Sequence, residues 1–321
     1  MRHYLIAFWN VENLFDVENS PDRPAWLQRR LAQELKGWNE TVLTRKISQL
    51  ARLIQQLNNG LGPDVLGVCE VENKPVLERL VRALPIAERD YQVAHADTSD
   101  ERGIDVAFIF DNRLFEKKEQ FSHVILKRTA TRDLFQVNLQ LRHSGRDLIL
   151  IGNHWPSRLG GQFESEPYRI LAGETLAYWH ERISEIKGRD AAILAMGDFN
   201  DEPFNRSLVD YALSTYQRRK VMNAQTPRFY NLMWPLLGTR LGTHYYDNFA
   251  SILDQFLVSR GLLKAGAVLS VDEQSVKIEQ FPEMTAKGNY PAPIRFGRPS
   301  AGLDQDGFSD HYPISVVLRE S

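Results

Sequence analysis

The sequence contains several short apolar runs that end in an acid, amide or imidazole side chain, and this pattern constrains the fold more than any other feature. Four of these runs lead into Asn10, Glu70, Asn153-His154 and Asp198-Phe199-Asn200. Near the C-terminus the order is reversed, because Asp310-His311 precedes the apolar run 312–318. Short apolar runs bounded by turn residues are typical of buried strands. We therefore predict that four strands lead into one edge of a sheet assembly and that the last strand leaves it, so that these side chains meet.

The composition is that of an ordinary globular protein. Of the 321 residues, 43% are hydrophobic and 25% are charged, and the net charge of −2 gives no strong positive field. Binding of nucleic acid would therefore depend on a local basic patch or a bound metal. The single cysteine, Cys69, excludes an intrachain disulfide and a multi-cysteine zinc site, and its apolar neighbours predict a buried thiol.

The sequence shows no segment that predicts membrane association or export. No apolar run reaches transmembrane length, and the first run is too short for a signal peptide. We therefore expect a cytoplasmic location, unless a leader has been removed. No obligate protein partner is expected.

Hydrophobic periodicity predicts helices and strands that alternate along the chain. Helices are predicted over 44–57, 73–84, 167–186 and 204–213. Strands are predicted over 4–10, 64–70, 91–95, 104–110, 121–127, 133–142, 147–153, 191–197, 252–258 and 312–318. Segment 11–40 and the Pro- and Gly-rich segment 282–308 are predicted to be long loops.

Most of the predicted strands are apolar on both faces, which suits sheets that are covered on both sides. Together with the alternation of helices and strands, this predicts an α/β fold in four layers, with two packed mixed β-sheets flanked by helices. Because motifs near both ends of the chain contribute to one site, we expect a single domain over residues 1–321.

The motifs resemble those of the endonuclease/exonuclease/phosphatase superfamily, the DNase I-like metal-dependent phosphoesterases. The resemblance covers almost the whole chain and rests on four motifs in order. These are Trp9-Asn10-Val11-Glu12-Asn13, Glu70-Val71-Glu72-Asn73, Gly197-Asp198-Phe199-Asn200 and Ser309-Asp310-His311-Tyr312-Pro313. The resemblance implies a DNase I-like fold and hydrolysis of a phosphoester by water.

Carried over to this sequence, the resemblance implies a metal site formed by Asn10, Glu70 and Asp310. Amide and carboxylate oxygens suit Mg²⁺ or Mn²⁺. Asp198 and Asn200 are two residues apart, which on an extended segment points both side chains the same way. We expect Asp198 to orient or deprotonate the attacking water and Asn200 to donate to phosphoryl oxygens. A second metal at this position remains open.

His154 and His311 are expected to supply hydrogen bonds or a proton to the phosphate. The resemblance implies that Asp254 pairs with His311. It also implies that an acid near the start of strand 104–110 pairs with His154, with Asp105 as the candidate and Glu101 as the alternative.

Several further residues are candidates for contact with substrate. Arg102, Arg158 and Arg169 are candidate ligands of phosphate oxygens, although a surface arginine is an equally good interpretation of each. The aromatic loop 243–247 and Trp38 are candidates for stacking on bases, although core packing is the simpler interpretation of the tyrosines.

These features predict a divalent-metal-dependent phosphodiester hydrolase with DNA as the favoured substrate, because the opening segment 10–16 resembles nuclease-like members. The alternative is a phosphatase or phosphodiesterase that acts on a nucleotide, an inositol phosphate or a lipid headgroup. A non-catalytic binding module on the same fold is a remote third possibility, because the central positions are all occupied. The choice between endonuclease and exonuclease remains open.

Overall fold

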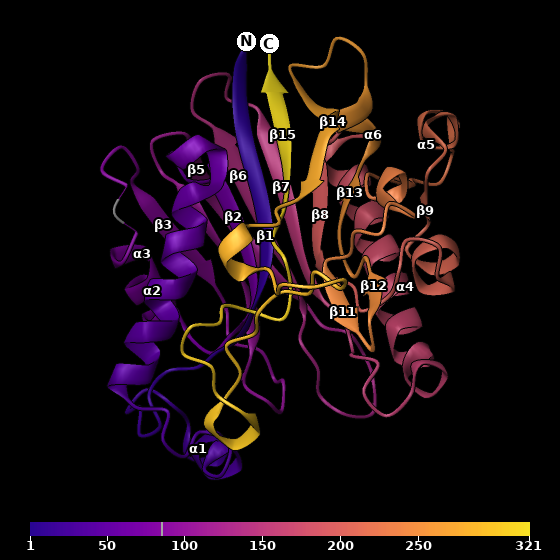
Figure 1. Cartoon of the computed structure of the whole chain (residues 1–321). Helices are drawn as coiled ribbons and strands as arrows, with labels where there is room; N and C mark the ends of the chain where they lie inside the picture. Colours follow the sequence, from indigo (N-terminus) through magenta and orange to yellow (C-terminus); the bar gives the residue numbers. More distant parts are fainter. Residues whose placement is uncertain (85) are drawn as a thin grey trace.

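Two mixed β-sheets pack face to face in the computed structural model, which describes residues 1–84 and 86–321 (Figure 1). The first sheet has the order β14 (Leu269–Ile278), β15 (Ile314–Glu320), β1 (Arg2–Leu14), β2 (Val65–Val71), β4 (Asp105–Asp111) and β3 (Tyr91–His95). The second has the order β5 (Phe115–His123), β6 (Leu134–Leu141), β7 (Asp147–His154), β8 (Ile193–Asp198), β13 (Asp254–Val258), β10 (Phe229–Asn231) and β9 (Ser214–Thr215). A separate hairpin pairs β11 (His244–Tyr246) with β12 (Phe249–Ser251).

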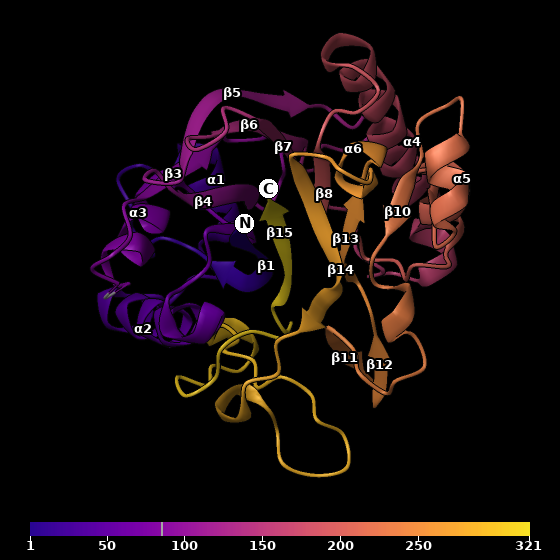
Figure 2. The ribbon, with the colours of Figure 1, turned by 90° about the horizontal axis from the view of Figure 1, so that it is seen from above.

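Helices cover the outer sides of the two sheets. Figures 1 and 2 show α2 (Glu40–Gln56) and α3 (Lys74–Arg82) on one side, and α4 (Gln162–Lys187), α5 (Arg218–Asn223) and α6 (Arg260–Leu263) on the other. The short helix α1 (Ala25–Leu31) lies at the bottom of Figure 1, at the end away from the chain termini. The start of α2 is fixed by Asn39, whose side chain accepts hydrogen bonds from the backbone N–H groups of Thr41 and Val42. Its apolar stripe is buried, as the helical spacing predicts.

Two glycines allow the sheets to pack closely around Phe108. A Cβ on Gly67 would lie 2.8 Å from the Phe8 ring and 3.2 Å from the Phe108 ring. A Cβ on Gly152, in the opposite sheet, would lie 2.5 Å from Val106 and 3.1 Å from Phe108. The absence of side chains at these two positions therefore makes room for the large ring at the centre of the core.

Strand β1 lies at the centre of the first sheet and brings the start of the chain next to its end. It pairs parallel with β2 and antiparallel with β15, so the termini lie side by side at one end of the molecule (Figure 1). At the other end, Trp9 Nε1 donates to the His311 carbonyl oxygen at 2.8 Å, and Ser309 Oγ donates to the Asn10 carbonyl oxygen at 2.6 Å. The first and last motifs of the sequence are thereby held at one edge.

The fold class predicted from the sequence is confirmed: the structure is an α/β sandwich of two mixed sheets flanked by helices. Most predicted elements are present within a few residues, and Cys69 is fully buried. Within the described residues, no helix has the length and apolarity needed to cross a bilayer.

The predicted loop over 11–40 is wrong in two places. Strand β1 continues to Leu14, and α1 forms within the segment. The polar sequence of this segment does not reveal the strand and the helix, because its polar side chains are paired inside the protein. Arg23, for example, donates to Glu72 through Nε at 2.6 Å. Trp38 is also fully buried, where it packs against Phe296, so it cannot stack on a base.

Other differences concern edge strands and short helices. β5 covers Phe115–His123 instead of 121–127, because the charged residues at its exposed positions mask the strand pattern. The predicted helix over 204–213 is a single π-helical turn, Ser207–Tyr211. The long strand β14 was not predicted, because its residues are mostly polar and half-exposed.

We expect Gly152→Ala to lower the free energy of unfolding by about 1–3 kcal/mol, because the new methyl group must displace Val106 and Phe108. Urea unfolding followed by circular dichroism measures this effect. Ser144→Ala, in the exposed β6–β7 turn, is the matched control and should change stability by less than about 0.5 kcal/mol. Equal stability of the two variants would contradict the close packing described here.

Candidate active site

Polar side chains from both sheets converge at one edge of the molecule. This edge lies opposite the end at which Figure 1 shows the chain termini. They come from the ends of β1, β2, β7 and β8, from the start of β13 and from the turn before β15: Asn10, Glu70, His154, Asp198, Asp254 and His311. Contacts of 2.7 to 3.9 Å link each of them to at least one other. The structure therefore brings together residues that lie as far apart as 10 and 311 in the sequence.

Unusual backbone conformations gather at this edge. Glu12, Asn13, Glu70 and Asn200 have positive φ angles of 51°, 54°, 63° and 50°. Irregular pairing interrupts β1 between Asn10 and Leu14, and it interrupts β2 at Glu70. A positive φ at a residue other than glycine costs about 1–3 kcal/mol and is concentrated at functional sites in proteins. The bulged strand ends direct these side chains toward one another.

Asp198 lies at the centre of the cluster. Its Oδ2 accepts a hydrogen bond from Asn10 Nδ2 at 3.1 Å, and its Oδ1 accepts one from the backbone N–H of Asn200 at 2.9 Å. Burial raises the pKa of Asp198 to about 6, although the charge of His311 opposes this shift. A carboxylate with this pKa is suited to accept a proton near neutral pH.

The glycine before Asp198 is required by the close approach of β7. Gly197 has a φ of 156°, and a Cβ there would collide with the carbonyl oxygen of Asn153. The side chain of Asn153 is itself occupied, because its Oδ1 accepts from Trp155 Nε1 at 2.9 Å. Gly197 therefore allows β8 to place Asp198 beside His154, whose Nε2 lies 3.8 Å from Asp198 Oδ2.

Asn200 does not project freely into the site. Its Nδ2 donates to the carbonyl oxygen of Trp155 at 3.0 Å and is 3.3 Å from Asp198 Oδ2. Donation to a phosphoryl oxygen, as the resemblance implies, would require one of these hydrogen bonds to be released. In the structure, Asn200 holds Asp198 in place.

His311 and Asp254 form the pair that the resemblance implies. His311 Nδ1 lies 2.7 Å from Asp254 Oδ2, and His311 Nε2 lies 3.9 Å from Asp198 Oδ2. Burial lowers the pKa of His311, but the negative charges of Asp254 and Asp198 outweigh it, and the pKa is raised well above its usual value. His311 is therefore an imidazolium that is held between two carboxylates.

Thr243 orients Asp254 from a neighbouring segment. Its Oγ1 accepts hydrogen bonds from the backbone N–H groups of Leu253 and Asp254, at 3.0 and 3.1 Å. Its carbonyl oxygen accepts from the N–H of Tyr312 at 2.8 Å. A single buried threonine thus ties the start of β13 to the chain next to His311, although nothing in the sequence pattern distinguishes it from other threonines.

His154 is neutral and lies between Glu70 and Asp198. Its Nε2 is 3.7 Å from Glu70 Oε1, and burial lowers its pKa well below the usual value. The charges of Arg132 and Arg102 lower this pKa further. Arg132, which the sequence did not single out, also pairs with Asp100 at 3.2 Å and donates to Trp155 O at 3.1 Å.

Glu70, Asp310 and Asn10 offer an oxygen-only set of ligand atoms. Glu70 Oε2 accepts from the N–H of Asn13 at 2.9 Å, which leaves Oε1 directed toward His154. Burial raises the pKa of Asp310; the charge of His311 opposes this shift, and that of Glu70 adds to it. Glu70 and Asp310 are half-buried, and neighbouring carboxylates are stabilised by a bound cation, so these residues fit a Mg²⁺ or Mn²⁺ ion.

Glu12 and Lys46 attach the C-terminal segment to this group of acids. Glu12 accepts hydrogen bonds from the backbone N–H groups of Phe296 and Gly297, at 2.9 and 3.2 Å, and pairs with Arg295 at 2.8 Å. Lys46 is fully buried and donates to the Phe308 carbonyl oxygen at 2.5 Å. The segment that precedes Asp310 is therefore fixed by buried charges.

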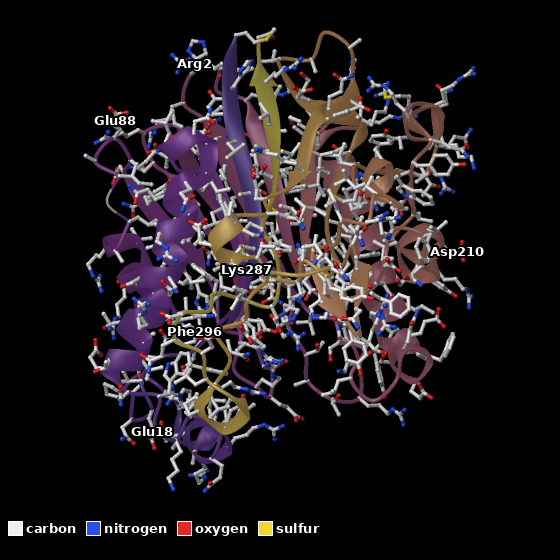
Figure 3. All side chains as sticks on the ribbon, in the orientation of Figure 1. Arg2, Glu18, Glu88, Asp210, Lys287 and Phe296 are labelled. Carbon is white, nitrogen blue, oxygen red and sulfur yellow. The ribbon has the colours of Figure 1, made fainter. Side chains whose placement is uncertain are left out.

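Burial lowers the pKa of Lys46 to about 8, although the negative charges of Glu12 and Asp310 oppose this shift. Its ammonium group also lies 4.9 Å from the centre of the Phe296 ring. Figure 3 shows Phe296 in the C-terminal segment, beside the helices of the first sheet. Neither Glu12 as an anchor nor Lys46 was identified from the sequence, because their backbone partners lie 284 and 285 residues away from Glu12 and 262 residues away from Lys46.

Another group of buried acids and a histidine is close enough to be considered for a metal: Asp198, Asp254 and His311. The short contact between His311 Nδ1 and Asp254 identifies this group as a hydrogen-bonded chain instead. Mg²⁺ and Mn²⁺ prefer oxygen ligands to imidazole nitrogen. The oxygen-only set is therefore the better cation site.

Two of the three predicted phosphate-binding arginines lie at the site. Arg102 donates to Asn13 Oδ1 at 2.8 Å and lies 3.8 Å from Glu70. Arg158 donates to the Asn200 carbonyl oxygen at 2.8 Å.

The prediction for Arg169 is wrong. Its guanidinium is fully buried, pairs with Asp201 at 2.8 Å and donates to Ser165 Oγ at 2.7 Å. No part of the side chain is accessible to a substrate, and the residue instead fixes the segment that joins β7 to α4.

Asp105 and Glu101 do not contact His154 among the described residues. Asp105 accepts from Thr98 Oγ1 at 2.6 Å and lies 3.4 Å from His95 Nε2, whereas Glu101 pairs with Arg30 at the surface. His154 Nδ1 is buried and has no hydrogen-bond partner in the described part of the chain. The expected support of His154 by one of these two acids is therefore not present in the structure.

The sequence matches the Endonuclease/Exonuclease/phosphatase family over residues 5–320. No match to a curated protein was found. Solved structures that are similar include the human Nocturnin catalytic domain with bound sulfate anion, at 16% identity and a TM-score of 0.55, covering 99% of this chain and 95% of that one.

Two other similar structures share 15% identity and a TM-score of 0.57 with this chain. They are the Bacteroides thetaiotaomicron mannosyl-6-phosphatase Bt3783, covering 98% of this chain and 99% of that one, and a humanized D. rerio TDP2, covering 99% of both. At these identities the likeness shows the fold alone.

We expect Asp254→Asn to lower the pKa of His311 toward about 6.5, because the largest charge that favours the imidazolium is lost. The native pair stabilises the fold fully below the unfolded pKa of about 6.5, and the contribution is lost as the pH rises through the raised folded pKa. NMR titration of the imidazole in the presence of EDTA measures the shift. An unchanged titration would show that Asp254 does not control the charge of His311.

Proposed function

The chain belongs to the endonuclease/exonuclease/phosphatase family and is a phosphoester hydrolase of that family; from this premise we propose that it is a divalent-metal-dependent phosphodiesterase that acts on nucleic acid. The observation that carries the proposal is the contact chain Asp254–His311–Asp198, with steps of 2.7 and 3.9 Å, beside the oxygen ligands Glu70 and Asp310. This arrangement places a proton acceptor, Asp198, and a cationic side chain, His311, at the same edge as a set of metal ligands.

The proposed reaction is in-line attack of water on phosphorus. Asp198, with its raised pKa, orients the water and accepts its proton. The imidazolium of His311 donates a hydrogen bond to a non-bridging oxygen, where negative charge develops in the transition state. His154, which is neutral, contributes a second hydrogen bond from Nε2 if its proton is on that nitrogen.

Members of this family generally depend on a divalent metal. We propose that Glu70 and Asp310 would hold the ion through carboxylate oxygens, with Asn10 Oδ1 beside them. When bound, such an ion supplies charge neutralisation for the leaving and non-bridging oxygens. Asn10 connects the proposed metal ligands to Asp198. Its Oδ1 faces the N–H of Glu12, and its Nδ2 donates to Asp198.

A pocket of about 430 Å³ adjoins the site and supports an anionic substrate. Its walls include the cationic side chains Arg30, Arg102, Lys127 and Arg132. Arg132 and Arg30 are paired with carboxylates, whereas Lys127 lies over the Tyr168 ring at 4.9 Å. A strand with several phosphates would place a second phosphate in this pocket.

A phosphomonoesterase is the second candidate. The net charge of −2 gives no general attraction to a polyanion, and one protein of the same fold is a mannosyl-6-phosphatase. A metal-containing screen with single-stranded DNA, supercoiled plasmid, bis-p-nitrophenyl phosphate and sugar phosphates distinguishes the two. Hydrolysis of the monoesters alone would contradict the nucleic-acid proposal.

We expect hydrolysis to require the metal. EDTA should abolish activity, and Mg²⁺ or Mn²⁺ should restore it, because the buried acids of the site need a cation to approach a phosphate. Glu70→Gln should weaken metal activation strongly, whereas Glu78→Gln, which changes an exposed acid paired with Lys74 on α3, should leave it unchanged. Full activity after rigorous chelation would contradict the mechanism.

We expect His311→Ala and Asp254→Asn each to lower kcat by about a hundredfold or more, because each removes the cation that faces the phosphate. Their double variant should be little worse than either single variant, since the pair acts as a unit. Steady-state kinetics at saturating Mg²⁺ measures this. Losses that multiply would show that the two residues act independently.

A further inference from the structure

The hairpin of β11 and β12 lies in the lower half of Figure 1, away from the chain termini. It carries two exposed aromatic side chains next to the candidate active site. Tyr246 lies directly opposite Phe249 in the hairpin, and the two residues are 79% and 75% exposed. Exposed aromatic side chains that are grouped in a pair, and not scattered singly, mark a surface that binds something.

The turn of the hairpin constrains the backbone that carries these rings. Asp247 and Asn248 have positive φ angles of 47° and 66°, the backbone of a two-residue type I′ turn. This turn matches the twist of the paired strands. A backbone that is already ordered loses little conformational entropy when a ligand binds.

The two rings lie on the face of the hairpin that meets His311. Alternate residues of a strand share a face, so Tyr246 lies on the same face as His244. The His244 ring is 4.7 Å from the His311 ring, and the backbones of these residues form an isolated bridge. Tyr245 points the other way and packs edge-on against Tyr312.

The distance along the strand suits one nucleotide. Tyr246 lies two residues beyond His244, which corresponds to about 7 Å in an extended strand. Cationic groups lie near the His244 end: burial lowers the pKa of His244, and the charges of His311, Arg158 and Arg295 lower it further, although the charge of Asp254 opposes them. A phosphate fits near these cations, and an attached planar group then reaches the rings.

We infer that Tyr246 and Phe249 form a stacking platform for the nucleobase next to the scissile phosphate, so that the substrate has an unpaired base at the position of cleavage. This inference rests on the proposed function. Aromatic rings stack on any base, because every base has a π-face, so the platform selects unpaired strands without selecting sequence.

The chemistry of the hairpin tip favours a base over a lipid surface. The residues at the tip are Asp247 and Asn248, which are polar and exposed, and the aromatic pair lies behind them. A hairpin that inserts into a bilayer presents apolar side chains first, and an aspartate at its tip would be repelled by anionic lipid. The rings are instead placed to receive a ligand from the side of His311.

The test compares a double alanine variant, Tyr246→Ala with Phe249→Ala, and a double leucine variant at the same positions. Leucine retains apolar area but has no ring, so it separates stacking from general hydrophobic contact. Tyr178→Ala is the control, because it removes a 53% exposed ring from α4. The substrates are a single-stranded thymine oligomer and an oligomer of equal length with abasic residues throughout.

In the full-length protein with Mg²⁺, we expect wild type to prefer the thymine oligomer. The ratio of kcat/KM for thymine over abasic substrate should fall by about 5- to 100-fold in both double variants, the effect of one lost stacked base. Fluorescence anisotropy with EDTA present should show the same loss in binding. Tyr178→Ala should keep the wild-type ratio.

Three results would overturn the inference in distinguishable ways. A wild-type enzyme that cleaves both oligomers equally, with the variants unchanged, is a phosphodiesterase without a base platform. A wild-type enzyme that cleaves neither oligomer but hydrolyses a phosphomonoester with metal shows that the proposed function has failed. Binding of wild type and leucine variant, but not alanine variant, to phosphatidylcholine vesicles would identify the pair as a lipid contact.

Discussion

The position of β1 between β2 and β15 is the constraint on which the rest of the structure depends. One strand from the start of the chain pairs with a strand that follows it and with the last strand of the chain. This pairing places Asn10, Glu70 and Asp310 at one edge, and packing of the second sheet adds Asp198 and His154. The hydrogen bonds from Trp9 and Ser309 fix the register of the first and last motifs to each other.

Buried charge is the main energetic cost of this arrangement, and the structure offsets it in two separate groups. Around His311, a cation lies between Asp198 and Asp254, so one buried imidazolium stabilises two carboxylates. Around Asp310, the charges of Lys46 and Arg295 oppose those of Glu12 and Glu70. The second group keeps an excess of carboxylate oxygen, which is the requirement for a divalent cation.

Buried hydrogen bonds also hold the segments around the site in place. Glu12, Arg169 and Thr243 hold three different segments with buried hydrogen bonds, and each removal would leave polar groups without partners. The hairpin with Tyr246 and Phe249 is exposed by contrast, and its position is set by its turn and by the contact between His244 and His311.

The sequence by itself determined the sheet sandwich and the principal site residues, because short apolar runs and the polar residues that end them are local patterns. The motifs around Asn10, Glu70, Asp198 and His311 are contiguous in the chain, and the pairing of Asp254 with His311 followed from a family resemblance. The local pattern also predicted α2 and α3 as helices with one apolar face and Cys69 as a buried thiol.

Only the tertiary structure decided which polar residues are accessible and which are internal. Arg169 and Arg158 look alike in sequence, yet one is fully buried against Asp201 and the other lies at the edge of the site. Lys46 stands on an ordinary helix, and its role depends on a carbonyl oxygen 262 residues later. The partners of a buried charge are chosen by packing across the fold, and no local pattern records them.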